Sequence, residues 1–455
     1  MQRDKIKDIL SNGRENERYT AAGWVRSVRK AQNVAFIDLT DGSGVQGLQV
    51  VVESTSMAFE LVESLHTGCS ITVRGELAES PGKGQRWDLK AEELTLLGTA
   101  DPETFPVQKK KHTLEFLRQK AHLRTRTNTF AAVFRLRSHL CHAIHEYFRQ
   151  RGFYYIHTPI ITASDCEGAG EMFHVTTTEE KNEKKDGKGF FDRPTYLTVS
   201  GQMEAELLAL GLGEVYTFGP TFRAENSNTP RHLAEFWMVE PEMAFYDLAE
   251  DMDLAEDFLK SILKYLLEHD LEDLEFMDRW YQKGLTGQLE QIVGSEFERI
   301  SYDVAVKLLE AGGRDFEYPC TWGHDLQTEH ERYLSEEKVG GPVIIFDYPA
   351  SIKPFYMRLS DDGRTVGAMD VIFPRIGEII GGSQREERLE VLRKRIQKLG
   401  LDEKNYWWYL DTRRFGTVPH SGFGLGLERT LLFLSGMANI RDVIPFPRTP
   451  GNAEF

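Results

Sequence analysis

The chain has 455 residues, of which 40% are hydrophobic and 28% are charged, and its formal net charge is −16. This balance is typical of globular proteins and excludes wholesale disorder, and the length suits two or three domains with large buried cores. No run of about 18 apolar residues occurs, so no membrane span is expected.

Residues 1–100 predict a small β domain of the OB-fold type. A short helix is expected at 56–66, between the third and fourth strands, and this order is that of a partly open five-stranded barrel. A fragment of an all-β sandwich is the alternative. The five strand-like runs, separated by turns at 41–44 and 81–84, are 19–25, 34–39, 45–52, 69–75 and 87–91.

Residues 101–127 contain two prolines, three consecutive lysines and little apolar periodicity, which predicts a linker or hinge. Residues 128–455 then predict one large α+β domain. Most of its strands follow one another across turns rather than alternating with helices, so an antiparallel sheet flanked by helices is favoured over a doubly wound sheet. The expected helices are 130–151, 199–211 and 248–269, and the expected strands are 215–223, 235–244, 343–347, 366–373 and 422–424.

Charge is unevenly distributed along the chain. Residues 109–137 carry nine basic side chains and one acidic one, whereas residues 247–275 carry eleven acidic side chains and two lysines. We expect a basic surface after the first domain, with plain solvated surface as the alternative, and an acidic face elsewhere that is expected to be plain solvated surface. The four cysteines lie far apart without a CxxC pair, and the first residues lack the apolar core of a secretory signal, so a cytoplasmic protein is expected.

The two strands at 215–223 and 235–244 predict a hairpin that gathers cationic side chains. Arg223, Arg231 and His232 surround its loop, and guanidinium groups match the oxygens of a polyphosphate. Phe236 follows on the second strand, where its ring can stack on a flat base. A surface ion pair is the alternative for Arg223 alone, but the combination favours a nucleotide site.

Residues 422–429 (Gly-Phe-Gly-Leu-Gly-Leu-Glu-Arg) predict a strand, a glycine-rich turn and the start of a helix. Arg429 then lies near the positive end of the helix dipole, which indicates an anionic ligand in front of it. Glu378 and Asp370 are candidate Mg²⁺ ligands, because paired carboxylates near phosphates hold this ion through oxygen atoms. A surface acid at a strand end is an equally good interpretation of Glu378 alone.

Together these segments resemble the class II aminoacyl-tRNA synthetases. Residues 134–159, 218–242 and 423–429 are similar to the three signatures of that family, in their order, and the first signature forms a dimer interface. An N-terminal OB domain followed by a hinge is typical of the subgroup for aspartate, asparagine and lysine. The resemblance covers essentially the whole chain, and residues 222–238 and 446–455 resemble the members that charge tRNA with asparagine.

The resemblance implies an ATP site in which arginines and Mg²⁺ neutralise the triphosphate. Arg223 is expected at the α-phosphate, Arg429 at the γ-phosphate and Phe236 on the adenine. The residues expected to bind ATP are Arg223, Glu225, Arg231, His232, Phe236, Glu378 and Arg429, of which Arg223, Glu378 and Arg429 are the expected catalytic residues; Mg²⁺ is expected on Glu378 with Asp370 or Ser383.

The resemblance also places the amino acid. Its α-amino group is expected at Glu167 and Gln202, its side-chain carbonyl at Arg385, and Ser200 and Glu225 belong to the same expected set.

One position separates asparagine from aspartate. The aspartate-specific relatives carry a lysine three residues after the glutamine that matches Gln202, where it pairs with the substrate carboxylate, and this chain has Ala205. A carboxylate would therefore meet one cation, Arg385, and the like charge of Glu225 or Glu206. A neutral amide can donate its NH₂ to a carboxylate, which the resemblance leads us to expect to be Glu225, and accept from Arg385, so asparagine is favoured.

The resemblance assigns the OB domain to the anticodon. Phe36 is expected to stack on the central uridine, with Arg29 and Gln46 at base edges, although Phe36 as plain core is the alternative. The basic segment 109–137 is expected along the tRNA backbone. The expected partners are tRNA(Asn), asparagine, ATP and a second copy of the chain.

Three other functions compete with asparagine–tRNA ligation. A relaxed aspartate enzyme would use the same nucleotide site. An asparagine synthetase related to the catalytic domain would lack the anticodon domain that this chain has. A non-catalytic RNA-binding dimer would have lost the ATP residues, which are present here.

Overall fold

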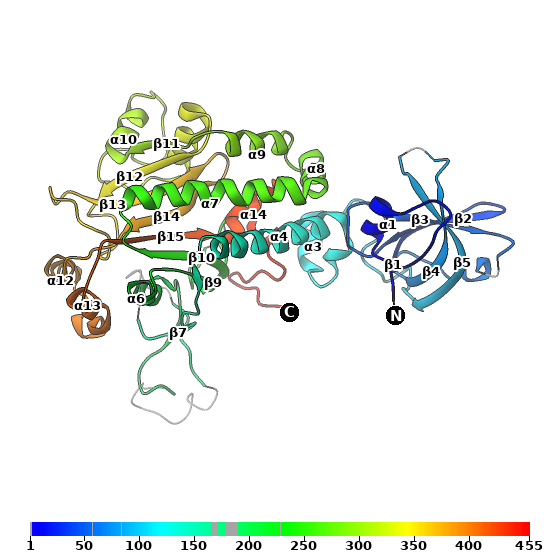
Figure 1. Ribbon diagram of the computed structural model, residues 1–455, viewed down its shortest axis with the longest axis horizontal. Coiled ribbons are helices and arrows are strands. Elements are labelled where there is room, and N and C mark those ends of the chain that lie inside the picture. Colours follow the sequence, from blue (N-terminus) through cyan, green and yellow to red (C-terminus); the bar gives the residue numbers. More distant parts are fainter. Residues whose placement is uncertain (1, 57, 83, 165–171, 178–189, 228) are drawn as a thin grey trace. The chain divides into compact units, whose positions relative to one another are not determined.

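The computed structural model describes residues 2–56, 58–82, 84–164, 172–177, 190–227 and 229–455 (Figure 1). Packing divides the chain into two compact units, residues 1–135 with 272–280 and residues 136–271 with 281–455. Among the described residues, no helix combines the length and apolar character that crossing a membrane requires.

The first unit contains a closed barrel of five strands in the order β1-β2-β3-β5-β4. Strand alternation buries Ala35 and Ile37 in the barrel and leaves Phe36 partly exposed, so Phe36 is not a core residue. The predicted five-stranded barrel is confirmed, although it is closed rather than partly open, and the sandwich alternative is wrong. Its elements are α1 (Ile6–Asn12), β1 (Arg18–Lys30), β2 (Val34–Thr40), β3 (Leu48–Glu53), α2 (Phe59–Val62), β4 (Ser70–Glu79) and β5 (Trp87–Gly98).

The stretch after the barrel contains more structure than an extended linker. It includes α3 (Leu114–Gln119), whose N-terminus is capped by the Thr113 side chain, and the short 3₁₀ helix η1 (Arg124–Arg126). The long helix α4 (Asn128–Gln150) follows. With six residues, α3 is too short to show a helical periodicity in the sequence, and the Thr113 cap and the burial of Leu117 stabilise it.

The second unit is built on a mainly antiparallel sheet of eight strands, in the order β11-β12-β13-β14-β15-β10-β9-β6. Only the pairs β11·β12 and β6·β9 are parallel. The α+β class and the antiparallel sheet are therefore confirmed. The strands are β6 (Tyr154–Tyr155), β9 (Glu214–Phe222), β10 (Glu235–Ala244), β11 (Glu298–Ser301), β12 (Val343–Pro349), β13 (Thr365–Phe373), β14 (Gly377–Gln384) and β15 (His420–Gly426); β7 (Ile161–Thr162) and β8 (Tyr196–Leu197) form a separate pair.

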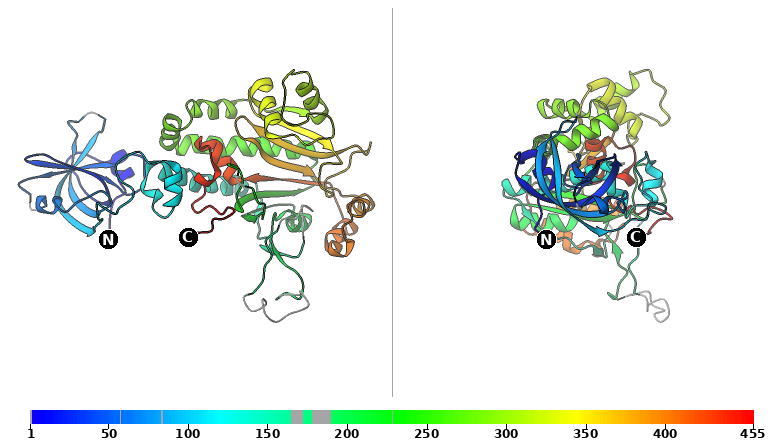
Figure 2. Two further views of the ribbon diagram at one scale, coloured as in Figure 1. Left: turned by 180° about the vertical axis from the view of Figure 1, so that it is seen from behind. Right: turned by 90° about the vertical axis from the view of Figure 1, so that its right-hand side faces the viewer.

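Helix α7 (Leu248–His269) has the predicted bounds and lies along the sheet in Figure 1, and Figure 2 shows the sheet from behind. A capping box formed by Asp247 and Glu250 starts it. Its Phe258 packs on Phe423 of β15, with 6.0 Å between ring centroids. The remaining helices are α6 (Gln202–Leu212), α8 (Leu271–Trp280), α9 (Leu285–Gly294), α10 (Tyr302–Glu310), α11 (Thr328–Arg332), η2 (Tyr333–Val339), α12 (Leu389–Lys398), η3 (Glu403–Asn405), α13 (Trp407–Arg414), α14 (Leu427–Ser435) and η4 (Ile440–Asp442).

The acidic run at 247–275 is not a plain solvated face, because three of its carboxylates are buried. Asp270 contacts His139 of α4 within the second unit, and Asp273 forms an ion pair with Arg135 within the first. Asp251 is fully buried in the first turn of α7. The hypothesis of a wholly solvated acidic surface is therefore wrong for these positions.

The centre of the sheet has two unlike faces. Successive side chains of a strand point to opposite sides, so Val239, Phe423 and Leu425 are buried on the face that α7 covers. The opposite face carries Met238, Glu240 and Glu242 of β10 opposite the glycines of β15. Gly422 is required, because a methyl group there would clash with the backbone oxygen of Pro241, and a methyl group at Gly424 would displace the end of Met238. On this face the glycines of β15 leave a depression bordered by the carboxylates of β10, which we call the glycine floor.

Candidate functional site

The seven residues predicted to bind ATP line one pocket. It lies over the glycine floor and encloses about 700 Å³, including space open to solvent. Cationic and acidic side chains surround an apolar base made by Leu233, Met238, Ile379 and Ile440. The predicted residues that meet here are Arg223, Glu225, Arg231, His232, Phe236, Glu378 and Arg429.

Arg223 and Phe236 face each other across the hairpin of β9 and β10. The Arg223 guanidinium lies over the Phe236 ring, with 5.4 Å between Cζ and the ring centroid. The Arg223 backbone N–H donates to Ala234 O at 3.0 Å, which fixes the end of the hairpin. Arg223 and Phe236 therefore place a cation and an aromatic ring side by side in the pocket, suited to the phosphate and the base of a nucleotide.

Arg429 reaches from the first turn of α14 to β14. Its Nη1 donates to Glu378 O at 3.1 Å and lies 3.6 Å from Glu378 Oε2. Both side chains remain partly exposed. Arg429, which the sequence places near the positive end of the α14 dipole, is thus balanced by the Glu378 carboxylate across the pocket mouth.

Arg231 and His232 complete the cationic side. Arg231 donates to Thr328 Oγ1 at 3.0 Å and to Arg375 O at 3.3 Å, so its guanidinium is held at the pocket wall. His232 Nε2 lies 3.9 Å from a Glu225 oxygen. Burial lowers the pKa of His232, with Glu225 opposing and the nearby arginines adding to the effect. The fixed positive charge of this pocket therefore comes from arginines.

Asp370 and Glu378 converge over Gly381. A methyl group at Gly381 would lie 2.9 Å from Glu378 Oε1 and 3.6 Å from Asp370 Oδ1. Lys353 holds the other Asp370 oxygen at 2.8 Å. Two converging carboxylates suit a hard cation that completes its shell with water and phosphate oxygens. Within the described ranges, no group of three acidic, histidine or cysteine side chains is placed to hold a metal ion by itself.

Ser383, the other predicted Mg²⁺ ligand, does not offer a free hydroxyl to Asp370 and Glu378. It lies further along β14, is fully buried, and its Oγ accepts a hydrogen bond from Arg385 Nη1 at 2.8 Å. The structure thus groups Ser383 with the residues predicted to bind the amino acid.

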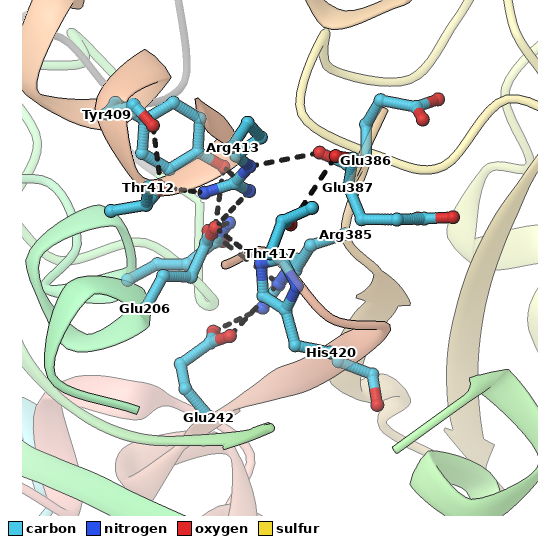
Figure 3. Close-up of polar contacts among 12 residues, drawn as sticks. Glu206, Glu242, Arg385, Glu386, Glu387, Tyr409, Thr412, Arg413, Thr417 and His420 are labelled. Carbon is cyan, nitrogen blue, oxygen red and sulfur yellow. Dashed lines mark hydrogen bonds and ion pairs between the residues drawn. The ribbon is translucent and has the colours of Figure 1, made fainter. Parts of the chain in front are cut away.

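Arg385 is the centre of a buried polar cluster (Figure 3). Both oxygens of Glu242 accept hydrogen bonds from it, and Nε is 3.1 Å from Oε2. A Glu206 oxygen lies 3.8 Å from the same Nε. One cation therefore lies between two carboxylates. Burial raises the pKa of Glu242 to about 8, although Arg385 opposes this shift, and the Glu206 charge adds to it.

Glu206 is held by donors on every side. Gln202 Nε2 donates to Oε1 at 3.0 Å, and Tyr409, Arg413 and His420 approach Oε2. Burial by itself raises the pKa of Glu206, but Arg413, His420 and Arg385 outweigh it and hold this pKa below its usual range. Glu206 therefore carries a stable negative charge beside Arg385.

The other predicted amino-acid residues are placed in three ways. Ser200 Oγ donates to Glu240, whose second oxygen accepts from the Gly201 N–H at 3.1 Å. Glu225 lies in the nucleotide pocket with His232 and belongs to its lining. Glu167 lies outside the described residues.

Sequence reasoning missed Glu240, Glu242, Tyr409 and Arg413. The first two were hidden in a strand expected only to complete a hairpin, although alternate acids on an otherwise apolar strand were a usable signal. Tyr409 and Arg413 are four residues apart, which places them on one helix face, but nothing in the sequence linked that face to Glu206.

The barrel brings together all three residues predicted to read the anticodon. Arg29, Phe36 and Gln46 line one shallow polar pocket. Arg29 and Phe36 are direct cross-strand partners, with Cζ 5.5 Å from the ring centroid, and Arg29 also donates to Gln49 at 3.1 Å. A second pocket of the same unit shares Asp38 and Lys109 with the first and contains Trp24 and Phe105. Aromatic and basic side chains thus form a continuous surface.

The basic segment 109–137 is less available than its composition predicts. Four of its arginines are engaged within the protein: Arg124 and Arg126 lie over the rings of Phe130 and Trp24, Arg135 pairs with Asp273, and Arg137 pairs with Glu428. Lys109, Lys110 and Lys111 are exposed. The basic surface expected from this segment is therefore smaller than its composition indicates, and its exposed part includes the lysine run.

Comparison with known proteins finds two family models that together span most of the chain. Residues 19–97 match the OB-fold nucleic acid binding domain, and residues 113–450 match the model described as tRNA synthetases class II (D, K and N). The asparagine–tRNA ligase of Nitratidesulfovibrio vulgaris (strain DP4) is 56% identical over 461 residues, covering 100% of both chains. That of Thermosynechococcus vestitus is 58% identical over 459 residues, covering 99% of both.

The fold is also similar to a solved structure. The asparaginyl-tRNA synthetase from Pyrococcus horikoshii, determined as a complex with asparaginyl-adenylate, superimposes with a TM-score of 0.89 at 31% sequence identity. The match covers 100% of this chain and 99% of that one.

Proposed function

This chain belongs to the class II tRNA synthetases (D, K and N), and we propose that it activates L-asparagine with ATP and transfers it to tRNA(Asn). The observation that carries the proposal is that all seven residues expected to bind ATP line one pocket. This pocket lies above the glycines of β15, on the sheet face that also bears Glu240 and Glu242. In the first step, the asparagine carboxylate attacks the α-phosphorus, pyrophosphate leaves, and an adenylate forms. In the second, a ribose hydroxyl at the tRNA 3′ end attacks the carbonyl carbon, and AMP leaves.

In this proposal the arginines do most of the electrostatic work. Arg223 stabilises the charge that develops at the α-phosphate, and Arg429 and Arg231 hold the γ-phosphate. Phe236 offers its ring to the adenine beside the Arg223 contact. Because these groups are already positioned by backbone and side-chain contacts, little reorganisation accompanies the reaction.

Mg²⁺ fits the two carboxylates that converge over Gly381, Asp370 and Glu378. The ion would neutralise phosphate charge and orient the leaving pyrophosphate. Ser383 is a weaker candidate ligand, since its hydroxyl serves Arg385.

The amino-acid pocket supports an amide substrate. Arg385 is the cation for the side-chain carbonyl, and the carboxylates beside it can accept from an amide NH₂. Gln202 and, outside the described residues, Glu167 are proposed for the α-amino group. Ser200 and Glu225 remain proposed members of this set.

We propose further that the barrel binds the anticodon through Phe36, Arg29 and Gln46, and that the exposed lysine run contacts tRNA phosphates. A homodimer is also proposed, through the first-signature segment. Its support is an apolar pocket there whose rim includes Tyr155, Ile160 and Ile161, exposed by 46%, 44% and 41%. Three cysteines of the described chain are free thiols, which agrees with the proposed cytoplasmic location.

The test is amino-acid-dependent ATP–pyrophosphate exchange with Mg²⁺, using asparagine and aspartate side by side. Exchange with asparagine alone is the expected result. Exchange with aspartate would preserve the ATP site and overturn this account of the pocket. Exchange with neither would favour a non-catalytic RNA-binding protein.

A further inference from the structure

Helix α13 directs two buried side chains into the polar cluster around Glu206 and Arg385 (Figure 3). Tyr409 is 0% and Arg413 is 4% exposed, and both contact Glu206 of α6, which is also 0% exposed. The Tyr409 hydroxyl donates to Glu206 Oε2 at 2.6 Å, and Arg413 Nη2 donates to the same oxygen at 2.7 Å. This helix lies outside the three signature segments.

Hydrogen bonds to groups other than Glu206 hold the Arg413 guanidinium in place. Its Nε donates to Glu386 O at 3.0 Å, and its Nη1 donates to Thr412 Oγ1 at 2.9 Å. Arg413 also donates to the Tyr409 hydroxyl at 2.8 Å, so the two donors from α13 support each other. They therefore approach Glu206 in one fixed arrangement.

Glu206 connects this arrangement to the substrate side. Its Oε2 is engaged by α13, while its Oε1 accepts from Gln202 and lies 3.8 Å from Arg385 Nε. Glu242 approaches Arg385 from its own strand. The single cation expected at the substrate side chain thus has two carboxylate neighbours.

We propose that Glu206 is a specificity-determining residue and that Tyr409 and Arg413 are positioning residues that hold its charge beside Arg385. The inference rests on the proposed function and deepens it. A substrate carboxylate gains little from an arginine that already binds Glu242 and lies beside Glu206, and the negative charge held on Glu206 repels it. An amide brings no charge, accepts from Arg385, and can donate to Glu206.

Stability alone does not account for this cluster. Buried ion pairs are often replaceable by packed apolar residues without loss of stability, because desolvation offsets most of their attraction. An acid that is held by four donors and lies beside the arginine proposed to bind the substrate is better explained by selectivity. It supplies the repulsive element that rejection of a close analogue needs.

The test compares ATP–pyrophosphate exchange for asparagine and aspartate in the full-length protein. Glu206→Gln removes the charge and keeps a similar shape, and we expect aspartate-dependent exchange, at most weak in the wild type, to rise at least about tenfold in kcat/KM relative to asparagine-dependent exchange. Tyr409→Phe removes one hydroxyl and should lower the asparagine-to-aspartate ratio of kcat/KM about two- to fivefold, mainly through the two KM values. The matched controls are Arg414→Gln, on the exposed face of α13, and Glu268→Gln, at the surface of α7.

An unchanged ratio in Glu206→Gln or in Tyr409→Phe, with both substrates altered by one common factor, would overturn the proposal. If the melting temperature shows that Glu206→Gln does not fold, the asparagine-to-aspartate ratio of kcat/KM in Tyr409→Phe tests the proposal instead. A wild-type protein without any asparagine-dependent exchange would instead overturn the proposed function itself, and the inference with it.

Discussion

The guanidinium of Arg223 lies over the ring of Phe236, with 5.4 Å between Cζ and the ring centroid. The two side chains come from opposite strands of one hairpin, β9 leading to Arg223 and β10 carrying Phe236. A cation over an aromatic face gains about 0.5–2 kcal/mol, depending on exposure. The hairpin therefore supplies a phosphate-binding cation and a stacking surface as one unit, and changing either should disturb both.

Arg223→Lys tests the cation while keeping its charge. Lysine lacks the planar fork that matches phosphate oxygens, so we expect kcat for ATP–pyrophosphate exchange to fall at least about 100-fold, or about 2.7 kcal/mol in the barrier, with little change in KM for asparagine. Arg332→Lys is the control, because Arg332 is half exposed and pairs with Glu336. A kcat within twofold of wild type would contradict the role given to Arg223.

Gly381→Ala tests the proposed Mg²⁺ site without altering a ligand. The added methyl group meets the mobile end of Glu378 at 2.9 Å, so it should displace that carboxylate at little cost to folding. We expect the Mg²⁺ concentration for half-maximal exchange to rise about tenfold, because one of two converging ligands moves. Gly367→Ala on β13 is the matched control, since its methyl would have only ordinary contacts at 3.7 Å. Equal Mg²⁺ requirements in the two variants would remove the support for this site.

Periodicity in the sequence predicted the barrel, α4, α7 and the central strands, because burial imposes that periodicity. Periodicity missed β14, because Gly381 and Gly382 interrupt the strand pattern. These glycines line the site rather than the hydrophobic core. The nucleotide residues were found because the hairpin and the glycine-rich turn keep them close in sequence. The cluster around Arg385 was not, because α6, β10 and α13 meet only in the folded chain.

Phe36→Ala tests the anticodon proposal. Phe36 is partly exposed and lies beside Arg29, so its loss should remove a stacking surface worth about 1–3 kcal/mol without opening the barrel core. We expect KM for tRNA(Asn) in aminoacylation to rise about 5- to 100-fold, with ATP–pyrophosphate exchange unchanged. Leu97→Ala is the control, because Leu97 is an exposed apolar residue of the same barrel, on β5. Parallel losses in exchange and aminoacylation would indicate a folding effect instead.

Ala205→Lys tests the amide preference from the other direction. Ala205 is fully buried beside Ala209 and Val215, so a lysine there brings both volume and a positive charge to the position that precedes Glu206. We expect asparagine activation to weaken at least about tenfold in kcat/KM. Ala205→Met adds a comparable unbranched chain without charge, and the difference between the two variants isolates the electrostatic part. Unchanged asparagine kinetics in Ala205→Lys would reject the argument.

Glu331 makes folding stability depend on pH. Burial, with the charges of Glu378 and Asp370, raises its pKa from an ordinary 4.5 to about 8. The folded protein therefore binds more protons than the unfolded chain between those values, and the contribution of Glu331 to stability is lost as pH rises from about 4.5 to 8. Glu331→Gln removes this dependence while keeping an acceptor for the Glu378 N–H.

In urea unfolding, the free-energy advantage of Glu331→Gln over wild type should therefore grow by up to about 1.4 kcal/mol per pH unit between pH 5 and 8 and then level off. The surface variant Glu337→Gln, which removes only a half-exposed ion pair with Arg314, should show no such slope. Mg²⁺ bound between Asp370 and Glu378 would neutralise the repulsion on Glu331. Adding the ion at pH 8 should consequently narrow the gap between Glu331→Gln and wild type, and a gap that is independent of both pH and Mg²⁺ would contradict the proposed electrostatic coupling.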